Sequence, residues 1–317
     1  MAASLGSALR TPYVQIDDTA LAEEPEMSSS AGGGPRVALV TGASAGIGRS
    51  LVRRLLQQGW TVYGGARSVD RMADLAAAGA TVLALDLTDD ASMAACVRRV
   101  QHEQGRIDAL VNNAGYGSYG ALEDVPLAEA RRQFEVNVFA LVRMCQLVLP
   151  AMRAQRRGTI VNVSSMAGRG WTPFGGWYHA TKHALEVLSD AMRVEVEPFG
   201  VKVVVIQPGR IDSEWSATAA RTLRASAGAS VYRKQIEPLA ALLEDYGGAA
   251  SPEVVTDAVV RALSTARPKR RYAMPAEARA AIFLHWLLPD AAWERLTSFG
   301  LRAAARRLRA GGGPAQN

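Results

Sequence analysis

Short apolar runs and longer amphipathic segments alternate along most of this chain. Val37–Thr41 is an apolar run of the length and type expected for a strand buried in a parallel sheet. In the segment Ile47–Leu56 apolar residues recur at helical spacing, and Gly59 is expected to end that helix. The first apolar run and the segment after it therefore predict a strand followed by a helix.

The same succession repeats as far as residue 275. Further strands are expected at Thr61–Gly64, Thr81–Leu85, Asp108–Asn112, Gly158–Ser164, Val201–Ile206 and Arg271–Met274. Further helices are expected at Ser92–Gln104, at Leu127–Arg153, through Tyr178 and Lys182, and after the N-cap Ser251. Strands alternating with helices predict an α/β fold: a single-domain, Rossmann-like, doubly wound parallel sheet of about seven strands with helices on both faces.

The ends of the chain differ from this central domain, 36–275. Residues 1–35 are rich in Ala, Ser, Gly and Pro and are expected to be a disordered N-terminal extension, within which Met27 is an alternative start to Met1. A C-terminal helical extension is expected over 276–310, and a disordered tail over 311–317.

Two further segments are expected to meet a ligand or a partner. Residues 210–250 interrupt the alternation after a strand's carboxyl end, where open α/β sheets bind ligands, so we expect a substrate lid there. The apolar segment Ala276–Leu288 is too short to span a bilayer. A core or oligomer contact is the favoured interpretation, while a wall of an apolar pocket and a membrane-surface contact aided by the basic tail stay open.

Composition narrows the class of protein. The 317 residues are 49% hydrophobic and 21% charged, as in an ordinary soluble globular protein. The net charge of +6 includes basic runs, but no aromatic residues interleave them, which argues against nucleic-acid binding. Neither the two cysteines nor the four histidines have metal-ligand spacing, so no metal and a reducing compartment are expected. With no secretory segment and no transmembrane segment apparent, we expect a cytoplasmic protein.

Tyr178 and Lys182 carry the first candidate chemistry. They are four residues apart, so on a helix they share one face. A lysine beside a phenol lowers the phenol pKa from about 10 towards neutrality, which suits general acid–base catalysis. Ser165 ends the preceding strand, while Ser164 points to its other side. Taken alone, such a pair is more often an ordinary surface pair of a helix.

A glycine-rich turn supplies the second candidate site. Thr41-Gly-Ala-Ser-Ala-Gly-Ile-Gly48 lies between the first strand and the first helix, where glycines let the backbone approach a pyrophosphate at the helix N-terminus. Arg67 follows the second strand, and no carboxylate precedes Asp70 there, which favours NADP(H) over NAD(H) unless Arg67 is only an exposed loop residue. Within the glycine turn, Ala45 occupies the position where a turn that binds NADP usually has a second basic residue.

Taken in order, these motifs resemble the short-chain dehydrogenase/reductase family of the classical type. They are Thr41-Gly-x-x-x-Gly-Ile-Gly48, Asn112-Asn-Ala-Gly115, Asn137, Ser165, Tyr178-x-x-x-Lys182 and Pro208-Gly209. The resemblance covers about residues 36–275. The stretch from Gly176 to Glu186 is similar to the branch that holds hydroxysteroid and retinol dehydrogenases and bacterial carbonyl reductases.

The resemblance implies a role for each matching residue. Tyr178 is the expected proton donor or acceptor, Lys182 its partner, Ser165 the hydrogen-bond donor to the substrate oxygen, and Asn137 part of a water-linked proton relay. By itself, a buried asparagine is equally well a satisfied structural amide. The expected cofactor-binding residues are Gly42, Ser44, Ala45, Gly46, Ile47, Gly48, Arg67, Asp86, Leu87, Asn113, Ala114, Gly115, Tyr178, Lys182, Pro208, Gly209, Ile211 and Ser213.

The expected function is therefore an NAD(P)-dependent oxidoreductase that favours NADPH. It would interconvert a ketone or aldehyde and an alcohol on a small apolar substrate, as a carbonyl reductase or alcohol dehydrogenase does. Two alternatives stay open: an epimerase or dehydratase whose nicotinamide cycles internally, and a non-catalytic dinucleotide-sensing protein. The family also implies a homodimer or homotetramer.

Overall fold

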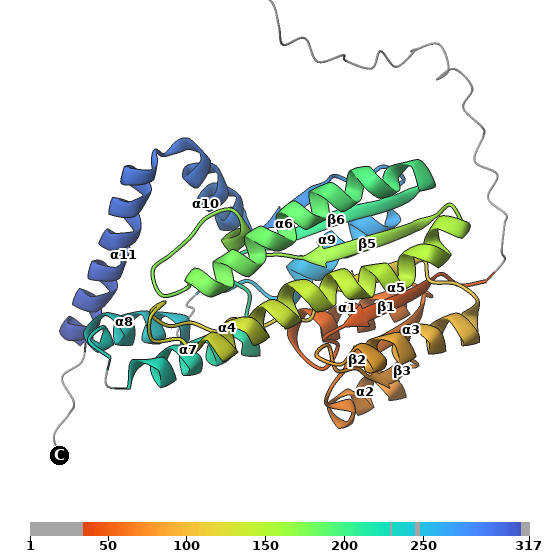
Figure 1. Cartoon of the computed structure of the whole chain (residues 1–317), viewed down its shortest axis with the longest axis horizontal. Helices are drawn as coiled ribbons and strands as arrows, with labels where there is room; N and C mark the ends of the chain where they lie inside the picture. Colours follow the sequence, from red (N-terminus) through yellow and green to blue (C-terminus); the bar gives the residue numbers. More distant parts are fainter. Residues whose placement is uncertain (1–33, 229, 245–247, 312–317) are drawn as a thin grey trace, which may run out of the picture. The chain divides into compact units, whose positions relative to one another are not determined.

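The computed structural model describes residues 34–228, 230–244 and 248–311. The disorder expected for residues 1–33 and 312–317 therefore falls outside the described residues. The seven strands are β1 (Val37–Thr41), β2 (Thr61–Ala66), β3 (Thr81–Ala84), β4 (Ala109–Asn112), β5 (Gly158–Val163), β6 (Val201–Pro208) and β7 (Arg271–Met274). They form one parallel sheet in the order β3-β2-β1-β4-β5-β6-β7 (Figure 1). This confirms the predicted Rossmann-like fold.

Helices cover both faces of the sheet. One face carries α3 (Asp90–Gln104), α5 (Ala140–Ala154) and α6 (Gly176–Val196), and the other carries α1 (Gly46–Gln57), α2 (Ala73–Ala77) and α9 (Pro252–Ser264). The strands serve both layers because successive side chains point to opposite faces: Leu39 belongs to the first core and Val40 to the second. Burial on both faces explains why the strands are continuous apolar runs.

Two segments are more complicated than the sequence pattern indicates. The segment between β2 and β3 holds a short 3-10 turn, η2 (Val69–Met72), and then α2, neither of which was predicted. The long helix expected at Leu127–Arg153 is α4 (Leu127–Phe134) joined to α5 through the π-helical turn η3 (Glu135–Phe139).

The combined helix Leu127–Ala154 is the one described segment long and apolar enough to cross a membrane by length and composition. The sequence pattern had not indicated such a stretch. Its α5 part, however, buries Met144, Cys145, Val148 and Met152 in the core beside the sheet. Core helices of soluble proteins meet the same criteria, so we treat it as a core helix.

The segment after β6 leaves the sheet and returns to nearly the same point. Ile211 forms an isolated bridge with Ala250, the Asp212 N–H donates to the Ala250 carbonyl at 2.9 Å, and the Ala250 N–H donates to the Arg210 carbonyl at 3.0 Å. Between them lie α7 (Glu214–Ala227) and α8 (Arg233–Glu244), which pack on each other. Their buried residues form a third apolar cluster, separate from the two cores of the sheet.

The C-terminal extension is helical, as predicted. It consists of α10 (Ala276–Leu287), which packs against β7, and α11 (Asp290–Gly311), which packs against α8 (Figure 1). Only Ala278 of α10 is buried, so the prediction of a core contact is wrong, whereas an oligomer contact, the other half of the favoured interpretation, stays a prediction. Ala281 and Ile282 instead line a cavity, which fits the pocket-wall alternative.

Candidate active site

One cavity of about 1340 Å³ lies at the carboxyl ends of the strands. It is lined by every catalytic and cofactor-binding residue predicted from the sequence except Gly48 and Asn137. The carboxyl edge of an open parallel sheet is where ligands bind in this class of fold. The structure therefore brings together residues that are as far apart in sequence as Gly42 and Ser213.

The turn between β1 and α1 requires glycine at three of its positions. Gly42 and Gly46 have φ of +68° and +50°, a region that favours glycine. A Cβ atom on Gly48 would lie 2.3 Å from the Gly42 carbonyl oxygen, so Gly48 shapes the turn from behind without touching the cavity. Asn113, directly after the neighbouring strand β4, holds the turn in place: its Nδ2 donates to the carbonyls of Thr41 at 3.0 Å and Gly42 at 3.2 Å.

The amino terminus of α1 suits a pyrophosphate. Its N-cap, Ala45, offers no side-chain hydrogen bond, and the first turn contains no acidic residue. The first N–H groups of the helix therefore have no side-chain acceptor, and the positive end of the helix dipole faces the cavity. These features fit the diphosphate of a dinucleotide cofactor. Ser213, expected at the nicotinamide, lies against this turn: a Cβ on Gly46 would be 3.2 Å from the Ser213 Cβ.

The opposite end of the cavity is set by the ends of β2 and β3. Arg67 follows β2 directly, is exposed and lines the cavity, as Asp86 and Leu87 do. Hydrogen bonds from the Thr88 N–H and hydroxyl, with the nearby Arg67 charge, hold the pKa of Asp86 below its usual value. An anionic Asp86 and a neighbouring cation thus mark the place where the resemblance puts the adenine and its ribose.

Tyr178 and Lys182 lie at the bottom of the cavity on one face of α6. Both side chains are buried, although each lines the cavity. The Lys182 Nζ lies 5.9 Å from the centroid of the Tyr178 ring. The surface-pair interpretation of these two residues is therefore wrong. Their positions suit the predicted acid–base pair.

The Lys182 ammonium has few polar neighbours. Its Nζ donates to the Val163 carbonyl of β5 at 2.9 Å, and a Cβ on Gly115 would lie 3.6 Å from it. Burial lowers the pKa of Lys182 to about 8, and the carboxylate of Glu186, one helical turn further on, opposes that shift. The lysine is thus set to change its charge near the pH at which enzymes work.

Asn137 lies in the π-helical turn η3, and π turns are frequent at functional sites. Its Oδ1 accepts from the Tyr116 N–H at 3.1 Å, and its Nδ2 donates to the Tyr116 carbonyl at 2.9 Å and to the Thr181 hydroxyl at 3.1 Å. A Cβ on Gly115 would be 3.1 Å from the Asn137 Oδ1. Asn137 is therefore a satisfied structural amide in this structure, and its relay role stays a prediction.

Ser165 and the loop after it form the wall beside Tyr178. The Ser165 hydroxyl accepts from the Ala167 N–H at 3.1 Å and lies 3.5 Å from the Pro208 carbonyl. His179, next to Tyr178, holds the rest of the loop: its Nδ1 lies 2.7 Å from the Gly170 carbonyl and 3.1 Å from that of Ala167. Because carbonyls only accept, Nδ1 must donate, and burial keeps the pKa of His179 below its usual value.

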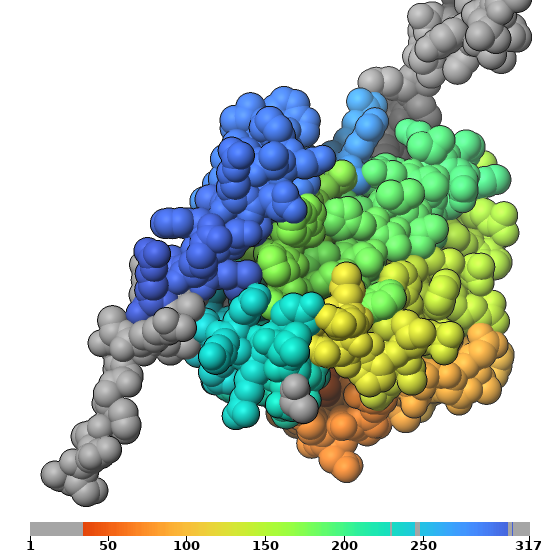
Figure 2. Space-filling view, turned by 60° about the vertical axis from the view of Figure 1, so that its left-hand side comes forward, coloured from red at the N-terminus to blue at the C-terminus, as the bar shows by residue number. Residues whose placement is uncertain are grey.

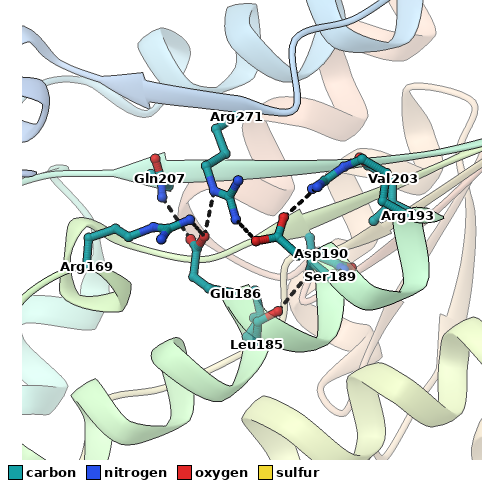
Figure 3. A network of polar contacts seen from close by, with 10 residues as sticks. Arg169, Leu185, Glu186, Ser189, Asp190, Arg193, Val203, Gln207 and Arg271 are labelled. Atoms are coloured by element: carbon teal, nitrogen blue, oxygen red, sulfur yellow. Dashed lines mark hydrogen bonds and ion pairs between the residues drawn. The ribbon is translucent and has the colours of Figure 1, made fainter. Parts of the chain in front are cut away.

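Behind Lys182, the buried carboxylate of Glu186 joins three elements around the site. It accepts from Gln207 at the end of β6 at 2.9 Å, from Arg271 of β7 at 2.9 Å, and pairs with Arg169 of the loop after Ser165 at 3.1 Å (Figure 3). Arg271 also pairs with Asp190 one turn along α6. Sequence reasoning missed this network, because Glu186 and Arg271 are far apart in the chain.

An aromatic cluster covers Tyr178 from the side of α7. The Trp215 ring of α7 lies 5.1 Å from the Tyr178 ring, and the Tyr119 ring lies 5.8 Å from it. A Cβ on Gly117 would lie 2.5 Å from Trp215, so a glycine is needed where the loop after β4 passes the indole. The part played by Tyr119 and Gly117 had not been predicted. Among the residues that the structure describes, no cluster of metal ligands accompanies the site.

Comparison with known proteins places the chain in a family. Residues 36–224 match the family model described as short chain dehydrogenase. The probable short-chain type dehydrogenase/reductase VdlC of Helicobacter pylori is 34% identical over 82% of this chain and 96% of its own length. The 3-ketodihydrosphingosine reductase of Bacteroides thetaiotaomicron is 42% identical over 55% of this chain and 64% of its own length. The NADPH-dependent 3-dehydrocapnine reductase of Ornithobacterium rhinotracheale is 31% identical over 80% and 93%.

Solved structures agree with this assignment. A short-chain dehydrogenase from Streptomyces avermitilis superimposes with a TM-score of 0.70 at 30% identity, over 86% of this chain and 98% of that one. A metagenomic short-chain oxidoreductase in complex with NADP superimposes with a TM-score of 0.61 at 29% identity, over 76% and 97%. With the parallel sheet, the glycine turn and the Tyr178–Lys182 pair already described, this chain belongs to the short-chain dehydrogenase/reductase family of oxidoreductases.

Proposed function

We propose that the protein reduces a ketone or aldehyde on an apolar substrate to the alcohol, and catalyses the reverse oxidation, with NADPH as the preferred cofactor. The observation that carries this proposal is the buried pair Tyr178 and Lys182 on one face of α6, in the same cavity as the uncapped amino terminus of α1. The residues for proton transfer and those for dinucleotide binding thus line the same cavity.

Each residue has a defined task in this proposal. When bound, the reduced nicotinamide supplies the hydride that adds to the carbonyl carbon. The Tyr178 hydroxyl donates a proton to the carbonyl oxygen, so that the carbonyl and its two added hydrogens become the alcohol. The Lys182 ammonium stabilises the phenolate that remains. Ser165 donates a hydrogen bond to the substrate oxygen and orients it towards Tyr178.

The walls of the cavity support an apolar substrate. Trp215 and Tyr119 lie against the Tyr178 ring, and the cavity continues to Ile282 and Leu301 of the C-terminal helices. Two of the relatives are named as reductases, of 3-ketodihydrosphingosine and of 3-dehydrocapnine, which supports a carbonyl group as the reacting part of the substrate. We therefore propose a carbonyl next to an extended apolar portion.

The residues at the end of β2 support a preference for NADPH. Arg67 follows that strand directly, where a carboxylate would instead bind the ribose hydroxyl of NAD. Arg67 also lines the cavity, so its guanidinium can reach a 2′-phosphate. The relative from Ornithobacterium is named as NADPH-dependent, and the metagenomic neighbour was solved with NADP.

The reaction is tested by following NADPH consumption with a panel of apolar ketones and aldehydes. We expect wild-type turnover, and a loss of at least about a thousand-fold in kcat for Tyr178→Phe, because general acid catalysis is removed from an otherwise intact site. Tyr272→Phe on β7 is the matched control and should keep full activity. A Tyr178→Phe variant as active as wild type would refute the mechanism. Product formation without net NADPH consumption would point to an epimerase or dehydratase instead.

The cofactor preference is tested separately at Arg67. We expect Arg67→Ala to raise the KM for NADPH about ten-fold or more, because a charge-assisted contact to the phosphate is lost. The KM for NADH should change little, since NADH carries no 2′-phosphate. Arg53→Ala, an exposed arginine on α1 paired with Asp74, is the control. Equal effects on both cofactors would mean that Arg67 does not read the phosphate.

A further inference from the structure

The side of α10 that faces away from the cavity is apolar and exposed. Phe283, Trp286 and Leu287 are 59%, 77% and 58% exposed, and the Phe283 and Trp286 rings lie 5.9 Å apart. On a helix these positions share one side, and the exposed Arg279 lies one turn before Phe283 on the same side. A contiguous exposed patch of large apolar side chains typically marks a site that binds a protein partner, a ligand or a membrane.

The outer side of α11 combines apolar and cationic side chains. Phe299 is 60% exposed, and the exposed Arg295, Arg302 and Arg306 lie four residues before it and three and seven residues after it, on the same side of the helix. An aromatic side chain surrounded by arginines is typical of a helix that lies on a lipid surface: the ring enters the acyl boundary and the guanidinium groups meet headgroup phosphates.

The charge of this surface favours one kind of occupant. Among the side chains that the structure describes on α10 and α11, four arginines are exposed: Arg279, Arg295, Arg302 and Arg306. Two acids are exposed there, Asp290 and Glu294, while Glu277 is paired with Arg210. A second copy of the chain docking here through a two-fold axis would bring the arginines around Phe299 towards their own copies, which like charges oppose. An anionic bilayer neutralises them instead.

The same two helices form a wall of the cavity. Ala281 and Ile282 of α10 and Trp293, Thr297 and Leu301 of α11 line it. The Trp293 indole donates to the Trp171 carbonyl at 3.0 Å, which ties α11 to the loop beside Tyr178. In Figure 2 the C-terminal helices (blue) lie beside the lid helices (cyan), in keeping with the packing of α11 on α8. The apolar outer surface is thus the other side of the cavity wall.

We propose that the outward sides of α10 and α11 form a docking surface for an anionic lipid bilayer. Phe283, Trp286 and Phe299 would enter the boundary between headgroups and acyl chains, and Arg279, Arg295 and Arg302 would bind lipid phosphates. Binding is peripheral and does not require a membrane-spanning helix. The proposal does not depend on the reaction, because it concerns the outer side of the helices only.

The test is co-sedimentation of the full-length chain with vesicles of phosphatidylcholine alone or mixed with phosphatidylglycerol. We expect binding to the mixed vesicles that weakens as salt is added. Phe283→Ser combined with Trp286→Ser should reduce binding at least about ten-fold, because apolar surface no longer enters the bilayer. Arg295→Gln with Arg302→Gln should weaken binding to mixed vesicles about 25-fold, at about five-fold per arginine, and leave binding to phosphatidylcholine unchanged.

Val187→Ser with Val194→Ser is the matched control, because these two exposed valines lie on α6, away from the C-terminal helices. This control should bind vesicles as wild type does, and thermal unfolding shows whether each variant is folded. Absence of wild-type binding to both kinds of vesicle would overturn the proposal. A wild-type oligomer that Phe283→Ser with Trp286→Ser dissociates, without any vesicle binding, would assign the surface to a second copy of the chain.

Discussion

At the scale of single residues, Lys182 has the most unusual surroundings in the site. Its ammonium is buried and has the Val163 carbonyl as a hydrogen-bond acceptor. Loss of hydration lowers its pKa to about 8, and the negative charge of Glu186 keeps the pKa from falling further. Glu186 in turn accepts hydrogen bonds from Gln207 and Arg271 and pairs with Arg169. The pKa of Lys182 therefore depends on its burial and on a carboxylate one helical turn away.

Glu186→Gln is predicted to alter the pH dependence of the reduction. Removing the carboxylate's charge lowers the pKa of Lys182 further below about 8. The ammonium that supports proton donation by Tyr178 is then lost at a lower pH, so the alkaline limb of kcat/KM should move to lower pH. The variant should also unfold more easily, by about 3 kcal/mol, because Arg169 and Arg271 lose a buried partner.

Asp190→Asn separates this effect from simple loss of stability. Asp190 pairs with Arg271 and Arg193 in the same network but is two turns from Lys182 and half exposed. It should lower stability less and leave the alkaline limb where it is. The pH profile is measured with initial rates at saturating NADPH, and stability with denaturant unfolding. An unmoved limb in Glu186→Gln would show that Glu186 only supports the fold.

The sequence predicted which residues meet in the cavity better than it predicted the contacts that hold them there. Tyr178, Lys182 and Ser165 stand out because their spacing on a helix and at a strand end has a chemical meaning. His179 and Glu186 follow Tyr178 and Lys182 by one and four residues, yet their partners, Gly170 and Arg271 among them, depend on how loops and a distant strand fold back. No pattern in a single sequence reports such contacts.

At the scale of elements, strands were predicted closely because burial on both faces makes each of them an apolar run. The unpredicted α2 is short, Ala73–Ala77, and has only Leu75 buried, so it leaves little periodic signal. The π turn η3 interrupts a helix without interrupting its apolar pattern, which is why one long helix was expected. It brings Asn137 to Tyr116 and Thr181.

The segment between β6 and α9 shows how far local patterns reach. Its place after β6 was predicted from the sequence, but the side of α7 that meets Tyr178 was not. Trp215 reaches Tyr178 because the Tyr119 N–H donates to the Thr222 hydroxyl of α7 at 3.2 Å and the Gly120 N–H donates to the Phe174 carbonyl at 2.8 Å. The first of these contacts attaches α7 to the loop after β4, and the second joins that loop to the loop before α6.

At the scale of the whole molecule, the cavity is a product of segments that the βα alternation does not include. The sheet supplies its cofactor side, whereas α7, α8, α10 and α11 supply the apolar side. Sequence analysis favoured a core or oligomer contact for the C-terminal segment because large apolar residues are usually buried. In the structure α10 packs against β7 and the 3-10 turn η4 (Met166–Gly168), with one side lining the cavity and another exposed.

This arrangement predicts that α10 controls the size of the substrate. Ala281 lines the cavity, whereas its neighbour Ala280 is exposed. Ala281→Trp should therefore fill part of the apolar end and lower kcat/KM for a bulky ketone about ten-fold, corresponding to about 1.4 kcal/mol. A small aliphatic ketone, which needs only the space beside Tyr178, should be reduced at the wild-type rate.

Ala280→Trp is the matched control, since the same side chain one position away should leave both substrates unaffected. Thermal unfolding of the two variants checks that neither has lost its fold. Because residue 281 lies on α10 whereas Tyr178 and Lys182 lie on α6, the loss should appear as a higher KM with kcat retained. An equal loss with both ketones would mean that α10 supports the site as a whole. In that case the apolar end of the cavity would not hold the substrate.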